Sequence, residues 1–315
     1  MYKKHIKKTA ATGLCYCLFA VLLLTACSKH PGDVMEIHDP ASGNTPQMQL
    51  KNKPVSLALS AGIAPLGTWW WSVNKRYWDR YLDFAGQNGV TEIYFYTVDF
   101  SSATSGFIEK AAGKGIKVFL LAGDYRWIHD RTGFITLMNQ YTQYQNSVSS
   151  AQRFSGVHLD VEPHQDPDFA QQRATIMQQY IDFVSWVCSQ YTGAGNLDFD
   201  IPFWLDDMVQ YQGQQRRLYE AVISAATRVF IMSYRDTAAK MYDVSKEELA
   251  FAGTQNKQIF LGAETASSKE GDAVTYFEEG KAYMYREFQK LPALCGNSNF
   301  GVSVHHIKSW YDMKK

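Results

Sequence analysis

The sequence predicts a (β/α)8 barrel of the TIM type, and three observations lead to this prediction. Eight short β-rich runs alternate with longer amphipathic or polar stretches, which is typical of βαβ units and a parallel sheet. Residues 55–315, which contain these runs, have the length of one such barrel, typically about 250 residues. The first run ends in Trp69-Trp-Trp71, where an open doubly wound sheet usually has a glycine-rich phosphate loop. We therefore favour a closed single-domain barrel over the open sheet.

The expected strands are rich in β-branched and aromatic residues. They are Leu66–Trp71, Glu92–Val98, Lys117–Ala122, Gly156–Val161, Leu197–Trp204, Arg228–Ser233, Gln258–Ala263 and Phe300–His305. Helices are expected between them because apolar residues recur at helical spacing. The clearest helices fall near residues 78–85 and 107–112, each followed by a glycine, and over residues 167–191 and 272–291. The last helix, within residues 309–315, is expected to be short.

The N-terminus predicts a targeting signal. Four lysines within residues 1–8 precede an apolar run from Ala10 to Leu24, which is shorter than the ~20 residues of a spanning helix. The following Leu24-Thr-Ala-Cys27 resembles the bacterial lipoprotein box. This resemblance implies that residues 1–26 are removed and that Cys27 is lipidated, which would anchor the protein in the bacterial cell envelope, facing the periplasm or the outside. An ordinary cleaved signal is the alternative.

Residues 27–54 are polar, contain proline and glycine, and predict a flexible tether. Without the four lysines of the signal, the neutral balance of 31 basic and 31 acidic residues becomes 27 against 31. This charge predicts no nucleic-acid partner. Cys188 and Cys295 would remain in the domain, either bridged or as free thiols. No cysteine or histidine pattern predicts a metal, and we expect no cofactor and a monomer.

The most informative run is Ser155-Gly-Val-His-Leu-Asp-Val-Glu-Pro163. Side chains alternate across a strand, so His158, Asp160 and Glu162 share one face and the apolar residues take the other. Because the apolar face should meet the helices, the polar face is expected inside the barrel. Buried carboxyls there predict acid/base chemistry with perturbed pKa values. The alternative is a hydrogen-bonded polar layer without catalysis.

This run resembles the Asp-x-x-Asp-x-Asp-x-Glu signature of family 18 glycoside hydrolases, the chitinases and endo-β-N-acetylglucosaminidases. It matches at Gly156, Asp160 and Glu162 and differs at Ser155 and His158, which replace aspartates. The resemblance implies that Glu162 protonates the glycosidic oxygen and that Asp160 orients the 2-acetamido group of the substrate. That group then attacks the anomeric carbon, a substrate-assisted route. A charged His158 would favour an anionic Asp160.

Two further runs extend the resemblance. Met232-Ser-Tyr234 resembles the family's Met-x-Tyr, which implies that Tyr234 hydrogen-bonds the substrate's amide group, although Arg235 separates it from Asp236. At the last strand the family has a tryptophan, and the nearest residues here are His305 and Trp310. The residues that we expect to bind substrate lie at strand ends or just beyond them. They are His158, Glu264, Trp127, Trp204, Asp236, His305 and Trp310.

Other functions remain open. Glu162 and Glu264 would also fit a retaining glycosidase in which one glutamate is the acid/base and the other the nucleophile. A barrel that binds carbohydrate without cleaving it is a third possibility, although such a protein has no need of a proton donor like Glu162. A metal-dependent hydrolase is disfavoured because the adjacent His305 and His306 face opposite sides of a strand.

Overall fold

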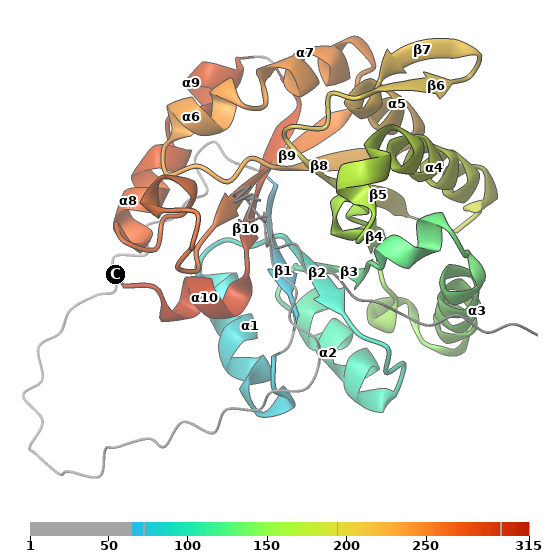
Figure 1. The fold of residues 1–315 in the computed structure, drawn as a ribbon. Coiled ribbons are helices and arrows are strands. Elements are labelled where there is room, and N and C mark those ends of the chain that lie inside the picture. The colour runs from blue at the N-terminus through green and yellow to red at the C-terminus, as the bar shows by residue number, and fades with distance from the viewer. Residues whose placement is uncertain (1–64, 72, 194, 297, 315) are drawn as a thin grey trace, which may run out of the picture. The chain divides into compact units, whose positions relative to one another are not determined.

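The barrel is closed by a pair of strands from opposite ends of the domain. In the computed structural model, which describes residues 65–314 except 72, 194 and 297, the first strand of the barrel pairs with the last one (Figure 1). Every neighbouring pair in the barrel is parallel. The predicted (β/α)8 barrel is therefore confirmed. The signal, Cys27 and the tether at 27–54 lie outside the described residues.

The strands of the barrel agree with the predicted runs to within two residues at each end. They are β1 (Leu66–Trp70), β2 (Glu92–Tyr96), β3 (Lys117–Ala122), β4 (Gly156–Leu159), β5 (Asn196–Pro202), β8 (Arg228–Met232), β9 (Gln258–Glu264) and β10 (Phe300–His305). A hairpin that the sequence did not reveal, β6 (Met208–Tyr211) and β7 (Gln214–Arg217), follows β5 and pairs antiparallel.

Helices surround the barrel (Figure 1). They are α1 (Trp78–Gln87), α2 (Ser102–Ala112), α3 (Thr132–Ser147), α4 (Phe169–Gln190), α5 (Leu218–Ala225), α6 (Ala238–Asp243), α7 (Lys246–Thr254), α8 (Lys281–Phe288), α9 (Leu291–Cys295) and α10 (Ile307–Asp312). The single helix expected over 272–291 is wrong. Gly280, with φ +87°, precedes α8, and Pro292 lies in the first turn of the separate α9.

The alternation along β4 decides what each of its faces contacts. Val157 and Leu159 are fully buried in the layer between strands and helices, together with Tyr180 and Val184 of α4. His158, between them, turns into the barrel and stacks on Tyr94 of β2, with ring centroids 4.2 Å apart. The polar face of β4 is thus directed into the barrel.

An ion cluster fills the barrel at the amino-terminal ends of the strands. Arg228, the first residue of β8, donates to Asp198 Oδ2 at 2.6 Å and to both Glu92 oxygens at 2.9 Å. All three side chains are buried, and the guanidinium lies over the ring of Phe119, 4.8 Å from its centroid. Because buried charges need well-placed partners, this cluster fixes the floor of the barrel.

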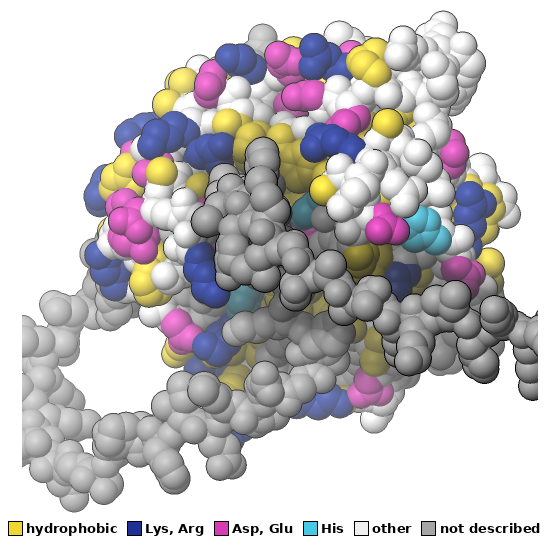
Figure 2. All heavy atoms as spheres, in the orientation of Figure 1, with side chains coloured by type: hydrophobic (Ala, Val, Ile, Leu, Met, Phe, Trp, Pro, Cys, Tyr) yellow, Lys and Arg dark blue, Asp and Glu magenta, His cyan; other side chains and the backbone are white. Residues whose placement is uncertain are grey.

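The helices and the two cysteines of the described residues bear on membrane insertion and on disulfide formation. Among residues 65–314, apart from the three gaps, no helix is long and apolar enough to cross a membrane. Cys188 and Cys295 are free thiols. On the face shown in Figure 2, acidic and basic side chains are interspersed over the outer helices.

Candidate active site

Glu162 lies just beyond β4, at the carboxyl-terminal mouth of the barrel where catalytic groups of this fold usually lie. Its side chain is 9% exposed and accepts a hydrogen bond from Gln165 Nε2. Burial, reinforced by the charges of Asp160 and Asp200, raises the pKa of Glu162 well above its usual range. The carboxyl therefore keeps its proton to a higher pH than an exposed glutamate does, which suits a general acid.

Asp160, two residues before Glu162 and on the same face, has a similar environment. Its backbone N–H donates to Ala122 O at the end of β3, at 2.9 Å. The next residue, Gly123, allows this close approach, because a Cβ at position 123 would collide with the carbonyl of Asp160. Burial and then the charge of Asp200 raise the pKa of Asp160 to about 7.

His158 contacts a carboxyl of the neighbouring strand β5. Its Nε2 lies 2.7 Å from Asp200 Oδ2. Burial lowers the pKa of His158 to about 4, although the nearby Asp198 acts in the opposite direction. The imidazole is therefore neutral near pH 7 and hydrogen-bonds Asp200, so the effect that a charged His158 would have on Asp160 does not arise.

Asp200 of β5 is the residue that the sequence reasoning missed. Its Oδ2 also accepts the Nε1–H of Trp69, at 3.0 Å. The signal was present in Leu197-Asp-Phe-Asp-Ile-Pro202, because the same alternation that was used for β4 places Asp198 and Asp200 on the inner face. Burial raises the pKa of Asp200 well above its usual range.

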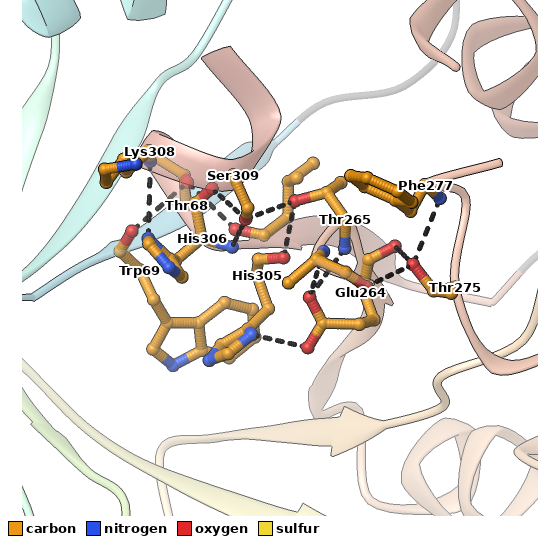
Figure 3. Close-up of polar contacts among 12 residues, drawn as sticks. Thr68, Trp69, Glu264, Thr265, Thr275, Phe277, His305, His306, Lys308 and Ser309 are labelled. Carbon is orange, nitrogen blue, oxygen red and sulfur yellow. Dashed lines mark hydrogen bonds and ion pairs between the residues drawn. The ribbon is translucent and has the colours of Figure 1, made fainter. Parts of the chain in front are cut away.

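Glu264 and His305 close the opposite side of the site (Figure 3). Glu264 Oε2 lies 2.8 Å from His305 Nδ1, and its Oε1 accepts the backbone N–H groups of Thr265 and Ala266, both at 2.7 Å. Burial alone would raise the pKa of Glu264, but His305 and the two N–H groups outweigh it and lower that pKa. Burial would lower the pKa of His305, but Glu264 raises it. The two groups form a buried ion pair.

Tyr234 follows β8 and lies between the β4–β5 carboxyls on one side of the site and the Glu264–His305 pair on the other. Its ring lies 5.7 Å from that of His305, between centroids. Burial raises the pKa of the Tyr234 hydroxyl well above its usual value, and the charges of Glu264, Asp200 and Asp160 add to this. The structure therefore gathers Tyr234 with carboxyls from three strands and keeps its hydroxyl protonated.

Trp204 lies beyond β5, near Glu162. Its ring is 5.3 Å from that of His164, and His164 Nε2 is 3.9 Å from Glu162 Oε1. The Arg173 guanidinium lies 5.3 Å from the centroid of the Trp204 ring. Trp204 is partly exposed, so one side of this aromatic group faces solvent next to the proposed acid.

Three other residues that we predicted to bind substrate, Trp310, Trp127 and Asp236, have other contacts in the structure. The prediction for Trp310 is wrong: its side chain is fully buried on α10, 5.2 Å from the ring of Phe84, and its Nε1 donates to Tyr285 Oη. Trp127 is 9% exposed and packs edge-on against Phe134, so most of its ring serves the core. Asp236 forms an ion pair with Lys240 at 3.0 Å.

Metal ligands do not gather in the described part of the chain. Among its residues there is no group of three or more histidines, cysteines, aspartates and glutamates that could hold a metal ion. The carboxyls of the mouth are instead held by imidazole, indole and backbone N–H groups. This donor set suits proton transfer more than metal binding.

No family model and no curated protein matches the sequence. Solved structures with similar folds include the spore cortex-lytic enzyme SleL of Bacillus cereus, 12% identical, with 78% of this chain and 73% of that chain covered and a TM-score of 0.47. They also include a chitinase of Bacteroides thetaiotaomicron, 11% identical, with 79% and 93% covered and a TM-score of 0.47. An endo-β-N-acetylglucosaminidase of Cordyceps militaris is 15% identical, with 78% and 82% covered and a TM-score of 0.45. The assignment of a reaction to this chain rests on its own residues.

Proposed function

We propose that this chain is a glycoside hydrolase that acts on a glycan or polysaccharide containing N-acetylhexosamine. The observation that carries the proposal is Glu162, a buried carboxyl at the barrel mouth whose pKa is raised by burial and by Asp160 and Asp200. A proton donor held in this way can protonate the oxygen of a leaving sugar at neutral pH. The non-acidic groups around it, Trp204 and Tyr234, supply an aromatic face and a hydroxyl donor.

The mechanism that we propose is substrate-assisted and retaining. Glu162 gives its proton to the glycosidic oxygen as the bond to the anomeric carbon breaks. The carbonyl oxygen of the 2-acetamido group forms a bond to that carbon, while Asp160 accepts the amide N–H and Tyr234 donates to the carbonyl oxygen. Water then opens the cyclic intermediate and returns a proton to Glu162, so no enzyme nucleophile is needed.

A two-carboxylate mechanism is the second candidate, with Glu162 as acid/base and Glu264 as nucleophile. The lowered pKa of Glu264 favours it, because a nucleophilic carboxylate must be ionised. Both oxygens of Glu264, however, already accept hydrogen bonds from His305 or the backbone. We therefore assign Glu264 to substrate binding and to fixing His305.

The test is hydrolysis of aryl glycosides of N-acetylglucosamine oligomers and of an N-glycopeptide by the detergent-solubilised full chain. Glu162→Gln should lower kcat on the N-glycopeptide, whose sugar leaving group needs a proton, roughly 100- to 10,000-fold. The exposed Asp182→Asn on α4 is the matched carboxyl-to-amide control and should leave the rate unchanged. If wild type and Glu162→Gln both bind the oligomers and neither cleaves any substrate, the protein is a carbohydrate-binding barrel.

A second comparison separates the two mechanisms. Substrates with a 2-hydroxyl in place of the 2-acetamido group cannot assist their own cleavage. If the substrate-assisted route operates, these analogues are not cleaved, and Asp160→Asn is at least as damaging as Glu264→Gln. If instead the 2-hydroxyl analogues are cleaved and Glu264→Gln abolishes activity, Glu264 is the nucleophile.

We also propose that the protein is anchored in the bacterial cell envelope through lipid on Cys27. The proposal is supported by the lysine-rich start, the apolar run and the Leu-Thr-Ala-Cys sequence. Metabolic labelling with a radioactive fatty acid should mark the wild-type protein and not Cys27→Ser. Equal labelling of the two proteins would exclude this anchor.

A further inference from the structure

Asp160 and Asp200 occupy neighbouring positions on the inner face of the barrel. β4 and β5 are parallel, and their paired residues run from Gly156 with Asn196 to Leu159 with Phe199. Continuing this register by one residue places Asp160 beside Asp200. Neighbouring strands are about 4.8 Å apart, and side chains at paired positions point to the same face. The two carboxyls are therefore adjacent.

Each of these carboxyls has one oxygen that no described residue satisfies. Oδ1 of Asp160 and Oδ1 of Asp200 are both buried without a hydrogen-bond partner. Two adjacent buried carboxylates cannot both be ionised at low cost, and a single shared proton would satisfy an acceptor on each. Burial raises the pKa of both groups, and the charge of Asp200 raises that of Asp160 further.

The contacts of Asp200 Oδ2 indicate where this proton lies. That oxygen accepts the indole N–H of Trp69 at 3.0 Å and lies 2.7 Å from His158 Nε2. A neutral His158 that carries its proton on Nε2 donates it to the same oxygen. Oδ2 is then occupied as an acceptor, which leaves Oδ1 of Asp200 as the atom that can hold a proton.

Asp198 lies below His158. The imidazole Nδ1 is 3.9 Å from Asp198 Oδ2 and has no hydrogen-bond partner among the described residues, while Asp198 accepts two N–H groups of Arg228. We use the name polar column for Arg228, Asp198, His158 and Asp200. It leads from the floor of the barrel to the carboxyls at its mouth.

We propose that Asp200 is a positioning residue of the active site, which shares one proton with Asp160 and, fixed by His158 and Trp69, holds that proton on its own Oδ1. This inference rests on the proposed function. When the substrate's amide N–H arrives, the proton stays on Asp200, and Asp160 presents a carboxylate oxygen to the amide. The pair therefore neither gains nor loses a proton in this step.

Other titratable groups face this pair and must be considered in any pH measurement. They are His158 from β4, Glu162 just after β4, Tyr180 from α4, Tyr234 after β8, and His305 from β10. Glu162 and His305 also have shifted pKa values, so a change in activity with pH would not identify the pair. The experiment therefore has to observe aspartate carboxyls directly.

The experiment is a pH titration of the full-length protein labelled with ¹³C at aspartate side-chain carboxyls and followed by NMR. Wild type should show a carboxyl step near pH 7, the value to which the pKa of Asp160 is raised. Asp200→Asn should remove this step and move the pKa of Asp160 downward, because the second carboxylate is gone. Asp160→Asn should remove the same step, and Asp182→Asn should keep it.

Kinetics give the second measurement. Asp200→Asn should lower kcat roughly 10- to 100-fold with little change in KM, since it alters protonation and leaves the binding surface intact. Asp200→Glu, which keeps a carboxyl, should restore part of kcat. Thermal unfolding shows whether each variant is folded. If Asp200→Asn is unstable, the carboxyl titration of a folded Asp160→Asn variant is used to test the shared proton.

The outcomes separate this inference from the proposed function. Suppose that the wild-type enzyme hydrolyses substrate and that Asp200→Asn is folded. If that variant then keeps both its kcat and the carboxyl step near pH 7, the role of Asp200 is overturned, and the proposed function still stands. A wild-type protein without hydrolytic activity rejects the proposed function. In that case the carboxyl titration still decides whether Asp160 and Asp200 share a proton.

Discussion

The imidazole Nδ1 of His305 lies 2.8 Å from Oε2 of Glu264, and these two residues are the last of their strands and partners in the β9–β10 register. This pair places a cation within the influence of Asp160 and Asp200 on the other side of the mouth. Both side chains are largely buried, so removing one partner would leave the other as an uncompensated buried charge, which costs more than the loss of a surface ion pair.

The first prediction concerns pH and stability. The pKa of Glu264 is lowered from 4.5, so its contribution is present above that pH and lost as the pH falls through the folded value. The pKa of His305 is raised from 6.5, so its contribution is present below that pH and lost as the pH rises through the folded value. Glu264→Gln should therefore destabilise the protein most between pH 4.5 and 6.5, by about 3 kcal/mol, and less on either side.

Urea unfolding of wild type and Glu264→Gln across this pH range measures the difference. The exposed Glu270→Gln serves as control and should change the free energy of unfolding by less than about 0.5 kcal/mol at every pH. A destabilisation by Glu264→Gln that does not vary with pH would contradict the ion pair.

The second prediction concerns the leaving group. If Glu162 is the proton donor, Glu162→Gln should be most harmful with natural sugars as leaving groups and much less harmful with a nitrophenolate, which leaves without protonation. We expect the kcat ratio of wild type to variant to fall by at least roughly tenfold between the two substrates. Equal ratios would show that Glu162 has another role.

The third prediction concerns the glycine beside Asp160. Gly123→Ala should lower kcat, because the new Cβ would displace the Asp160 backbone. Gly106→Ala on α2 is the matched control, since no atom lies within 4 Å of its Cβ position. The control should stabilise the protein by about 0.4–1 kcal/mol without changing kcat. Normal activity in Gly123→Ala would mean that the position of Asp160 is not critical.

The fourth prediction separates two tryptophans. Trp310→Ala should reduce the free energy of unfolding by about 3–5 kcal/mol, because the ring is fully buried. Trp204→Ala should cost less stability and raise KM several-fold, because the ring is partly exposed near Glu162. Denaturant unfolding and substrate titration measure the two effects. A KM increase confined to Trp310→Ala would reverse the assignment.

The barrel could be predicted because each strand carries a local pattern of β-branched and aromatic residues. In the hairpin, β6 has only four residues, with Val209 and Tyr211 on its buried face, and β7 is entirely polar, so the segment gave no such signal. The break at Gly280 depends on a positive φ, which helical spacing of the surrounding apolar residues concealed.

For the site, alternation along β4 indicated which side chains enter the barrel, but it could not reveal their partners. The register between β4 and β5 pairs residues 40 positions apart and brings Asp200 within hydrogen-bond distance of His158, and such a register is a property of the closed sheet. The same limitation explains the misplaced Trp310. A tryptophan just after a strand can reach the mouth or the core, and only the course of α10 decides between them.

The polar column has a consequence for engineering. Asp200 at the mouth is hydrogen-bonded to His158, which lies directly above the Asp198–Arg228 ion pair at the far end of the barrel. A graft of Asp160 and Glu162 alone onto another scaffold would lack this support. Transfer of the chemistry would require the β4, β5 and β8 segments together, and directed-evolution libraries that alter substrate preference are better confined to the loops beyond the strands.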